Sequence, residues 1–303
     1  MTEIKDGVYD NISIEDYHAN TSHVSATTLK YARQSLRHFD WYRAGKIERE
    51  EKSQFGFGNA FELALLASTE YLQKVAVTPE NDWIEAAQAN QVKEGKAPFS
   101  KPRSSGIYQK AEAEFLAANE GKYLINETGK ESFECIEEML SSCYQDKIIQ
   151  GLIKNTEYQL SLFWTDPETG IKLKTRPDIC KRKKNVIVNL KTTLDGSPEA
   201  FSKDLKKYDY PLQAVLEIQG CLRTGIMDKL DSYFWLVCEK VAPFNATIYE
   251  FAERDMAAVT DTLSYLLNKI KKGQDQNIWP GYTERADNEY GILKAEIPLW
   301  YRY

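Results

Sequence analysis

The chain has 303 residues, a formal net charge of −6 and an apolar fraction of 42%. This composition is typical of a globular protein and excludes a disordered chain. The acidic excess argues against a general nucleic-acid coat, which carries basic charge.

Five widely spaced cysteines lack the paired spacing of zinc or iron–sulfur sites. Their odd number, and a start without an apolar leader, predict a protein of the reducing cytoplasm. No segment approaches the roughly 20 apolar residues of a membrane span, so we expect no membrane contact. His18, His23 and His38 are expected to be surface or capping residues.

The first elements expected along the chain are helices. Ser25 is suited to cap a helix over residues 26–39, where apolar side chains recur at helical spacing. A helix over residues 57–67 is apolar on nearly every face, so we expect it to be buried. Its one charged side chain, Glu62, is costly to bury unless it is salt-bridged at an edge or holds a metal.

The segment 77–104 holds three prolines, a glycine and several lysines, and predicts an exposed connection. It is expected to be a solvated loop, with DNA contact as the alternative. Scaffold helices are expected over residues 105–119 and 132–147, followed by a strand over residues 157–165.

A strand over residues 171–179 would place Lys172, Lys174, Arg176 and Asp178 on one face. The polar run 181–185 predicts a turn, and the next strand would place Asn189 and Lys191 on one face. A hairpin of the two strands would bring Asp178, Asn189 and Lys191 together. A carboxylate, a second oxygen ligand and an ammonium group suit a divalent cation and a phosphate.

Local charge agrees with this prediction. From Thr169 to Lys207 the sequence holds eleven Lys or Arg against four Asp or Glu. A solvated hairpin and helix would explain this excess. Its coincidence with the candidate metal ligands favours a phosphate-binding groove instead.

The elements after this hairpin are mostly helical. A helix over residues 211–223 would place Gln213 and Glu217, four residues apart, on one face. The other elements expected here are a helix over 198–206, strands over 232–238 and 246–251, and an amphipathic helix over 256–270.

The strings Pro177-Asp178 and Asn189-Leu190-Lys191 resemble the motif of the PD-(D/E)xK nucleases, in which an acidic residue, any residue and lysine follow Pro-Asp. That motif is short and weak by itself. The runs Gly170–Ile179, Leu190–Thr193, Tyr210–Ala214 and Gly58–Glu62 also resemble the RecE-like exonuclease branch. The resemblance therefore covers roughly residues 10 to 285.

This resemblance implies an α/β fold, with a mixed central β-sheet flanked by helices, a restriction-endonuclease-like core and N-terminal helical additions. It implies a single nuclease-like domain over residues 1–303. The expected parts are a helical lead-in (1–56), a core (57–285) with a helical insert (77–150), and a tail (286–303).

The resemblance also implies a metal-dependent exonuclease that degrades double-stranded DNA from its ends in phage or prophage recombination. Glu62, Asp178, Asn189 and the Leu190 carbonyl would hold one or two Mg²⁺ ions, or Mn²⁺. Lys191 would activate water and stabilise phosphate charge, and Gln213 would position them. The residues implied to contact DNA are Ser25, Lys174, Arg176, Thr192, Thr193 and Tyr210. A ring-like homo-oligomer and a single-strand annealing protein are the implied partners.

One departure concerns Asn189, where the family has Asp or Glu. An amide offers one neutral oxygen, so metal affinity and turnover are expected to fall. Glu217 stands where the family often has tyrosine and could supply the missing charge. Asn189 is either an introduced substitution or the natural residue of a nuclease-dead relative that binds DNA or a recombination partner. A third hypothesis is an unrelated α/β scaffold with a solvated hairpin.

Overall fold

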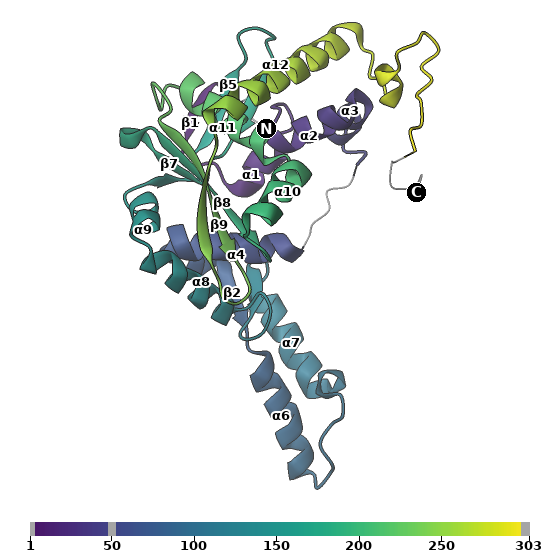
Figure 1. The fold of residues 1–303 in the computed structure, drawn as a ribbon. Helices are drawn as coiled ribbons and strands as arrows, with labels where there is room; N and C mark the ends of the chain where they lie inside the picture. Colours follow the sequence, from purple (N-terminus) through teal and green to yellow (C-terminus); the bar gives the residue numbers. More distant parts are fainter. Residues whose placement is uncertain (1–3, 48–52, 298–303) are drawn as a thin grey trace.

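The computed structural model describes residues 4–47 and 53–297 (Figure 1). A five-stranded sheet has the order β10 (Ala246–Glu250), β9 (Ser232–Glu239), β8 (Val186–Thr193), β7 (Ile179–Lys181) and β4 (Glu157–Tyr158). A three-stranded sheet has the order β1 (Gly7–Tyr9), β5 (Ser161–Thr165) and β6 (Lys172–Thr175). Strands β8 and β9 run parallel and the other pairs of these sheets are antiparallel, so the predicted mixed α/β fold is confirmed.

Helices cover both faces of the five-stranded sheet and pack two separate cores against it. The first face carries α2 (Ala26–Gln34), α3 (Leu36–Arg43), α10 (Pro198–Tyr208), α11 (Tyr210–Arg223) and α12 (Glu253–Gln276). The second carries α4 (Ser53–Leu66), α8 (Phe133–Gln145) and α9 (Lys147–Ile153). Along β8, Ile187 belongs to the first core and Val188 to the second, as strand alternation requires.

Helix α11 lies unusually close to β5 and β6, because Gly220 faces them. A Cβ atom at Gly220 would lie 2.7 Å from Thr175 Cγ2 and 3.0 Å from Trp164 Cζ3. Contacts that short are excluded by van der Waals repulsion, so a larger residue would push the helix outward. Gly220 thus fixes the height of α11 above the sheets, and with it the polar side chains of its first two turns.

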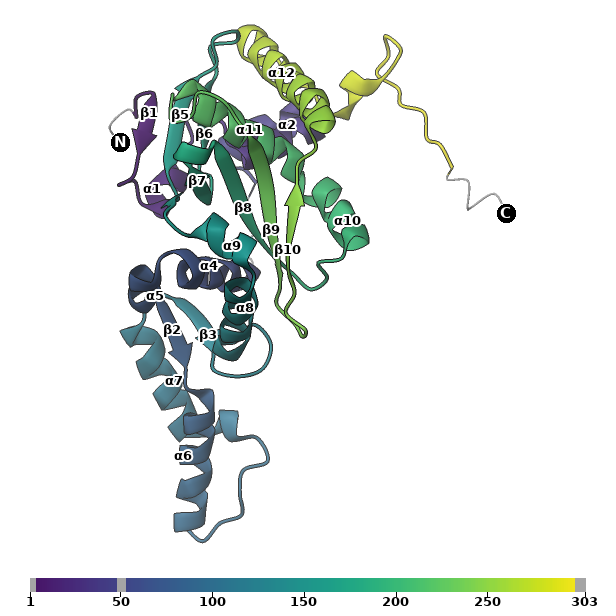
Figure 2. The ribbon, with the colours of Figure 1, turned by 60° about the vertical axis from the view of Figure 1, so that its left-hand side comes forward.

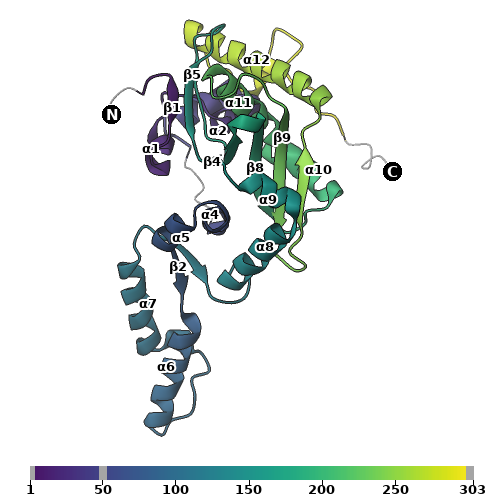
Figure 3. The ribbon, with the colours of Figure 1, turned by 90° about the vertical axis from the view of Figure 1, so that its left-hand side faces the viewer.

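The segment expected as an exposed connection is instead largely helical, and that prediction was wrong. Helix α6 (Glu80–Lys93) packs against α7 (Gly106–Ala118), with Trp83 lying edge-on to Tyr108 and Phe115. The prolines and glycine lie mainly in the connection between these helices, which includes the short helix η1 (Pro102–Ser104). The two helices form an arm that extends away from the body in all three views (Figures 1, 2 and 3).

The remaining small elements connect these layers. They are α1 (Ile14–Ala19), α5 (Ser68–Lys74), the parallel pair β2 (Val75–Thr78) and β3 (Tyr123–Asn126), and the short helices η2 (Arg182–Lys184) and η3 (Tyr282–Arg285). Among the helices of the described residues, none is both long and apolar enough to cross a lipid bilayer.

Three predicted elements are broken in the structure, one of them at Gln159 in the site described below. The helix expected over 26–39 ends at Gln34, because Ser35 is extended and its hydroxyl caps α3 by accepting from the His38 N–H. The strand expected over 171–179 stops at Thr175 and resumes at Ile179. Proline at 177 has no N–H to continue a ladder, so β6 and β7 join different sheets. The expectation of a surface position for His23 was also wrong, since its side chain is buried beside Phe163.

Candidate active site

A cleft of about 260 Å³ opens where α2, α4 and α11 approach the break between β6 and β7. We call it the active cleft. Of the residues predicted from the sequence, those that line it are Ser25, Glu62, Arg176, Asp178, Gln213 and Glu217. Three further predicted residues on β8 hydrogen-bond to this lining, as described below, so the structure brings most of the predicted site together.

Asp178 lies in the break itself, directly before β7. Its Oδ2 accepts a hydrogen bond of 2.7 Å from the backbone N–H of Leu190 on β8. Burial raises the pKa of the Asp178 carboxyl, while Lys191, the Leu190 N–H and Arg176 oppose the rise. The proline that interrupts the strand therefore leaves Asp178 directed at β8 rather than into a ladder.

Glu62 reaches the cleft from α4, the buried helix that crosses below the five-stranded sheet (Figure 2). Burial, and then the nearby Asp178 carboxylate, raises the pKa of Glu62 to about 8. Its Oε1 accepts a 2.7 Å hydrogen bond from Gln159 Nε2, and Gln159 Oε1 accepts one of 3.2 Å from Arg176 Nη2. Glu62 is therefore a half-buried carboxylate held by a neutral donor.

Gln159 is a site residue that the sequence reasoning missed. It lies between β4 and β5 with a left-handed backbone (φ 51°), which is uncommon for a residue other than glycine. In the sequence, Gln159 is a polar residue at a regular position of the expected strand over 157–165, so nothing there predicted a turn. The conformation interrupts the expected strand over 157–165, and the side chain occupies the cleft lining.

Lys191 and Gln213 form the next part of the site. Lys191 Nζ donates to Gln213 Oε1 over 3.4 Å and lies 4.4 Å from the centre of the Tyr210 ring. The ring face attracts the ammonium group and holds it beside the cleft. Tyr210 and Gln213 occupy the first turn of α11, so this helix sets the position of the lysine.

Asn189 and Glu217 meet between β8 and α11. Asn189 Nδ2 donates to Glu217 Oε1 over 3.1 Å, and both side chains are buried. Glu217 also accepts from Gln213 Nε2 and from the Tyr233 hydroxyl, each at 2.8 Å. Burial, and then Asp178, raises the pKa of Glu217 to about 8.

Two residues implied to contact DNA are structural supports. Lys174 is only 4% exposed, and its ammonium donates to the Tyr17 and Asn20 carbonyls. The expectation that Lys174 faces DNA was therefore wrong, because its ammonium group is buried and hydrogen-bonded to backbone carbonyls. Arg176 lines the cleft, yet its guanidinium is tied to the Ile12 carbonyl and the Ser161 hydroxyl.

The threonines after Lys191 lie at the end of β8. Thr193 Oγ1 donates to the Asp195 carbonyl in the turn that follows. Thr192 Oγ1 is 3.4 Å from where a Cβ of Gly58 would lie, so it faces α4. Neither is among the residues that line the active cleft.

Lys30 is a second residue that sequence reasoning missed. It lines the cleft from α2, one turn after Ser25 and Thr27. Burial, and then the nearby Lys191 ammonium, lowers the pKa of Lys30 to about 8, against a smaller rise from Asp209. The signal was its position on the polar face of α2, opposite the buried Leu29 and Ala32.

The donor atoms of the cleft fit a hard divalent cation. In residues 4–47 and 53–297, no three His, Cys, Asp or Glu side chains are already close enough to hold a metal. Glu62, Asp178 and Glu217 nevertheless line one cleft, and no Lys or Arg of the described chain forms an ion pair with them. Asn189 Oδ1 is buried without a hydrogen-bond partner. Carboxylates that are partly or fully removed from solvent and have no ion-pair partner are suited to Mg²⁺ or Mn²⁺.

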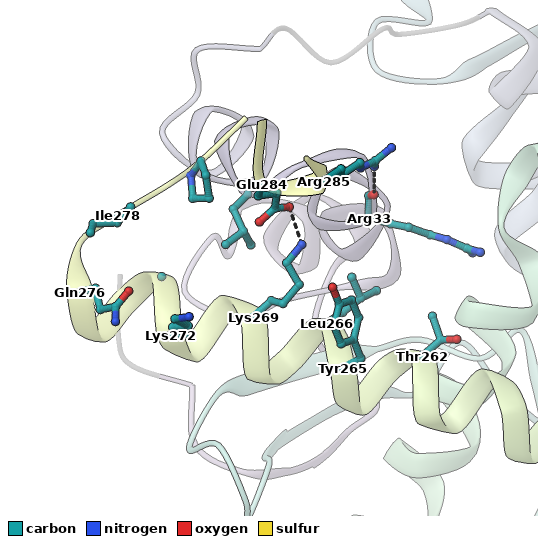
Figure 4. A pocket seen from close by; sticks show the side chains of 13 residues that line it. Arg33, Thr262, Tyr265, Leu266, Lys269, Lys272, Gln276, Ile278, Glu284 and Arg285 are labelled. Carbon is teal, nitrogen blue, oxygen red and sulfur yellow. Dashed lines mark hydrogen bonds and ion pairs between the residues drawn. The ribbon is translucent and has the colours of Figure 1, made fainter. Parts of the chain in front are cut away.

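A larger hollow of about 700 Å³ lies between α12, the end of α2 and η3 (Figure 4). We call it the α12 groove; its charged lining consists of Arg33, Lys269, Lys272, Glu284 and Arg285. Lys269 pairs with Glu284, and Arg285 donates to the carbonyls of Arg33 and Gln34 at 3.0 and 2.7 Å. This groove holds no cluster of carboxylates.

The fold is that of the PD-(D/E)xK nuclease class. A sequence model of the family described as "PDDEXK-like domain of unknown function (DUF3799)" matches residues 25–290, and the chain belongs to this family. Nucleases of the class generally use divalent metals.

Comparison with solved structures supports the fold. A crystal structure from Eubacterium rectale, of a protein provisionally named an exonuclease, superimposes with a TM-score of 0.57 at 15% sequence identity. The match covers 97% of this chain and 98% of that chain. A second structure, named SSO0001, matches 71% of this chain and 86% of its own at 13% identity, with a TM-score of 0.26 too low to carry an argument. No curated protein matches the chain.

Proposed function

We propose that this protein is a metal-dependent exonuclease that degrades double-stranded DNA from its ends, with Mg²⁺ or Mn²⁺ as the cofactor. The observation that carries this proposal is the meeting of Glu62, Asp178 and Lys191 at one cleft: the two carboxylates line it, and Lys191 donates to Gln213 in its lining. The Eubacterium rectale neighbour, itself provisionally named an exonuclease, is consistent with the same activity.

The bound metal would supply Lewis-acid stabilisation of the phosphate and a lowered pKa for the attacking water. Asp178 and Glu62 would hold it, with the Leu190 carbonyl and position 189 contributing oxygen. Lys191 would stabilise the negative charge that grows on the phosphate, with Tyr210 keeping its ammonium in place. Gln213 would orient the water, since its side chain already bridges Lys191 and Glu217.

The DNA backbone would pass the start of α2. Ser25 caps this nine-residue helix, and its free N–H groups and positive dipole end lie in the cleft lining with Thr27 and Lys30. A phosphate there would also supply the counter-charge that Lys30 lacks. The role in phage-type recombination, the ring-like oligomer and the annealing partner belong to the same proposal and rest on the sequence resemblance. A cytoplasmic location is also part of the proposal and rests on the unpaired cysteine pattern.

The proposal is tested by incubating linear and covalently closed circular double-stranded DNA with the protein and Mg²⁺ or Mn²⁺. Linear DNA should release nucleotides and closed circles should stay intact, because an exonuclease needs an end. Asp178→Asn should abolish release while leaving DNA binding in place. Cutting of closed circles would show that the protein is an endonuclease and not an exonuclease.

A second candidate function is favoured by the neutral side chain at position 189. A nuclease fold without its second acidic strand residue would bind DNA ends or a recombination partner and cut nothing. In that case wild-type protein binds linear DNA without releasing nucleotides in either metal.

A further inference from the structure

Position 189 lacks the carboxylate that the family has there, and the contact between β8 and α11 brings the Glu217 carboxylate beside it. Asn189 is 0% exposed, and its amide nitrogen faces the Glu217 carboxylate at 3.1 and 3.5 Å. The opposite orientation would put an amide oxygen against carboxylate oxygens, so the donor orientation is enforced. The two residues lie 28 positions apart in the sequence and are brought together by the packing of α11 on the sheet.

An aspartate at 189 would not fit beside this partner. Its carboxylate would lie about as far from Glu217 as the amide does now, and two unpaired carboxylates at that distance repel strongly in a buried site. The neutral residue on the strand and the acidic residue on the helix are therefore mutually compatible, and the number of acidic groups at this point of the cleft is kept at one.

Glu217 is buried and forms no ion pair within the described residues. The side chain is 1% exposed and lines the active cleft. Its three hydrogen-bond donors, Asn189, Gln213 and Tyr233, are all neutral, and no Lys or Arg in the described ranges pairs with it. A buried carboxylate held only by neutral donors remains costly, which a bound cation would relieve.

A second observation points to a ligand at the same place. Asn189 Oδ1 is buried and has no hydrogen-bond partner. An amide oxygen left in that state destabilises an ordinary core. It is an additional neutral oxygen donor beside the Glu217 carboxylate, a combination suited to a hard cation.

Building on the proposed function, we propose that Glu217 on α11 takes the place of the acidic strand residue as a ligand of the divalent metal, with Asn189 positioning its carboxylate. The active cleft then offers Glu62, Asp178 and Glu217 as its three carboxylates. In this arrangement Asn189 does not inactivate the protein, because Glu217 on the helix provides the carboxylate that the family has on the strand.

The test measures Mn²⁺ binding by calorimetry and thermal unfolding with EDTA or Mn²⁺, beside cleavage of linear DNA. Wild type, Glu217→Gln, Asn189→Asp and the double variant Asn189→Asp/Glu217→Gln are compared. Asp178→Asn is the positive control for loss of metal binding. Glu138→Gln, an exposed glutamate on α8, is the matched negative control.

A ligand role predicts that Glu217→Gln weakens Mn²⁺ binding at least about tenfold and removes the rise in Tm caused by Mn²⁺. In EDTA the same variant should melt no lower than wild type, because a buried charge has been removed. The double variant should regain Mn²⁺ binding and cleavage, since the carboxylate returns to the strand. A purely structural role for Glu217 would not produce this rescue. If Glu217→Gln alone folds poorly, Mn²⁺ binding and cleavage by the double variant still decide the question.

Three outcomes would overturn the proposal. If Glu217→Gln keeps wild-type Mn²⁺ affinity while Asp178→Asn loses it, the nuclease assignment stands and Glu217 is structural. If wild type binds no Mn²⁺ and Asn189→Asp gains both binding and cleavage, Asn189 is an inactivating residue. If neither wild type nor any variant binds Mn²⁺ or cuts linear DNA, the proposed function falls as well.

Discussion

The active cleft and the α12 groove differ in how their charges are compensated, and this difference identifies the site better than size does. The α12 groove has the larger volume, about 700 Å³ against about 260 Å³. Its charged side chains are mostly compensated inside the protein: Lys269 pairs with Glu284, and Arg285 with two helix-end carbonyls. In the active cleft, the buried Glu217 and the half-buried Glu62 have no ion-pair partner among the described residues, and their pKa values rise to about 8.

Uncompensated buried charge destabilises a fold, and a protein retains it where a ligand supplies the balance. The four residues Glu62, Asp178, Glu217 and Lys30 all have pKa values displaced toward the neutral form, with burial as the largest cause. A bound metal ion would compensate the three carboxylates, and a DNA phosphate would compensate the Lys30 ammonium. The α12 groove has no comparable deficit, so removing its charges should matter little.

The largest expected effect follows from Asp178→Asn, with Glu284→Gln as its counterpart in the α12 groove. Loss of a metal-holding carboxylate should lower the rate of nucleotide release roughly 10³-fold, which corresponds to about 4 kcal/mol. Glu284→Gln should leave the rate within about twofold. Release of nucleotides from linear DNA at saturating Mg²⁺ measures both. If both variants lost the same fraction of the rate of nucleotide release, the active cleft could no longer be distinguished from the α12 groove as the catalytic site.

Lys191→Met compared with Lys269→Met is the next test. Lys191→Met should lower cleavage roughly 10²-fold or more, since the charge that stabilises the phosphate is gone. Lys269→Met breaks its ion pair with Glu284 and should cost about 1 kcal/mol of stability without changing cleavage. Single-turnover cleavage and urea unfolding separate the two effects. A catalytic loss in Lys269→Met would show that the groove takes part in the reaction.

Lys30→Met should make the protein more stable and weaken its binding to DNA. The folded-state pKa of Lys30 is about 8 against an ordinary value of 10.5, so below pH 8 the charged side chain is present at its full cost. Between about pH 8 and 10.5 the unfolded chain binds more protons, and the unfolding free energy of wild type should rise with pH. At pH 7 the variant should gain about 1–3 kcal/mol.

The same Lys30→Met variant should bind DNA less tightly, with the salt dependence of the logarithm of affinity reduced by about one phosphate contact. Urea unfolding at pH 7 and pH 10 and DNA titrations at several salt concentrations measure these changes. A variant that is less stable at pH 7 would contradict the assignment of Lys30 as an uncompensated buried charge.

The smallest effect is expected from Lys272→Gln, on an exposed residue of the α12 groove. Its stability should stay within about 0.5 kcal/mol of wild type and its cleavage should be unchanged. DNA titration of this variant against Lys30→Met sharpens the comparison. A loss of DNA affinity as large as that of Lys30→Met would extend the DNA path from the start of α2 into the groove.

Much of the fold could be predicted from periodicity. The helices α7, α8, α11 and α12 and the strands β8, β9 and β10 fall where the apolar spacing places them. The breaks were missed where one residue overrides a continuous pattern: Ser35 ends α2, and Pro177 ends β6. In both places the apolar spacing continues across the break, so only capping and the missing N–H could have signalled it.

The sequence alone determined which residues could form the site. Asp178 beside a proline, Lys191 on a β-branched strand and Glu62 in an apolar helix are local signals that need no partner to be read. The tertiary structure decided what each charge does. Lys174 and Arg176 share a pattern with Asp178, yet Lys174 donates to the carbonyls of Tyr17 and Asn20, and Arg176 donates to the Ile12 carbonyl at the edge of the cleft.

The pairing of Asn189 with Glu217 was likewise decided by tertiary structure. Gly220 brings α11 close to the sheet, and the carboxylate arrives beside a strand position 28 residues earlier. Alternation gives the face on which a side chain lies, but burial and long-range packing choose its partner, and the partner determines whether a buried charge is compensated.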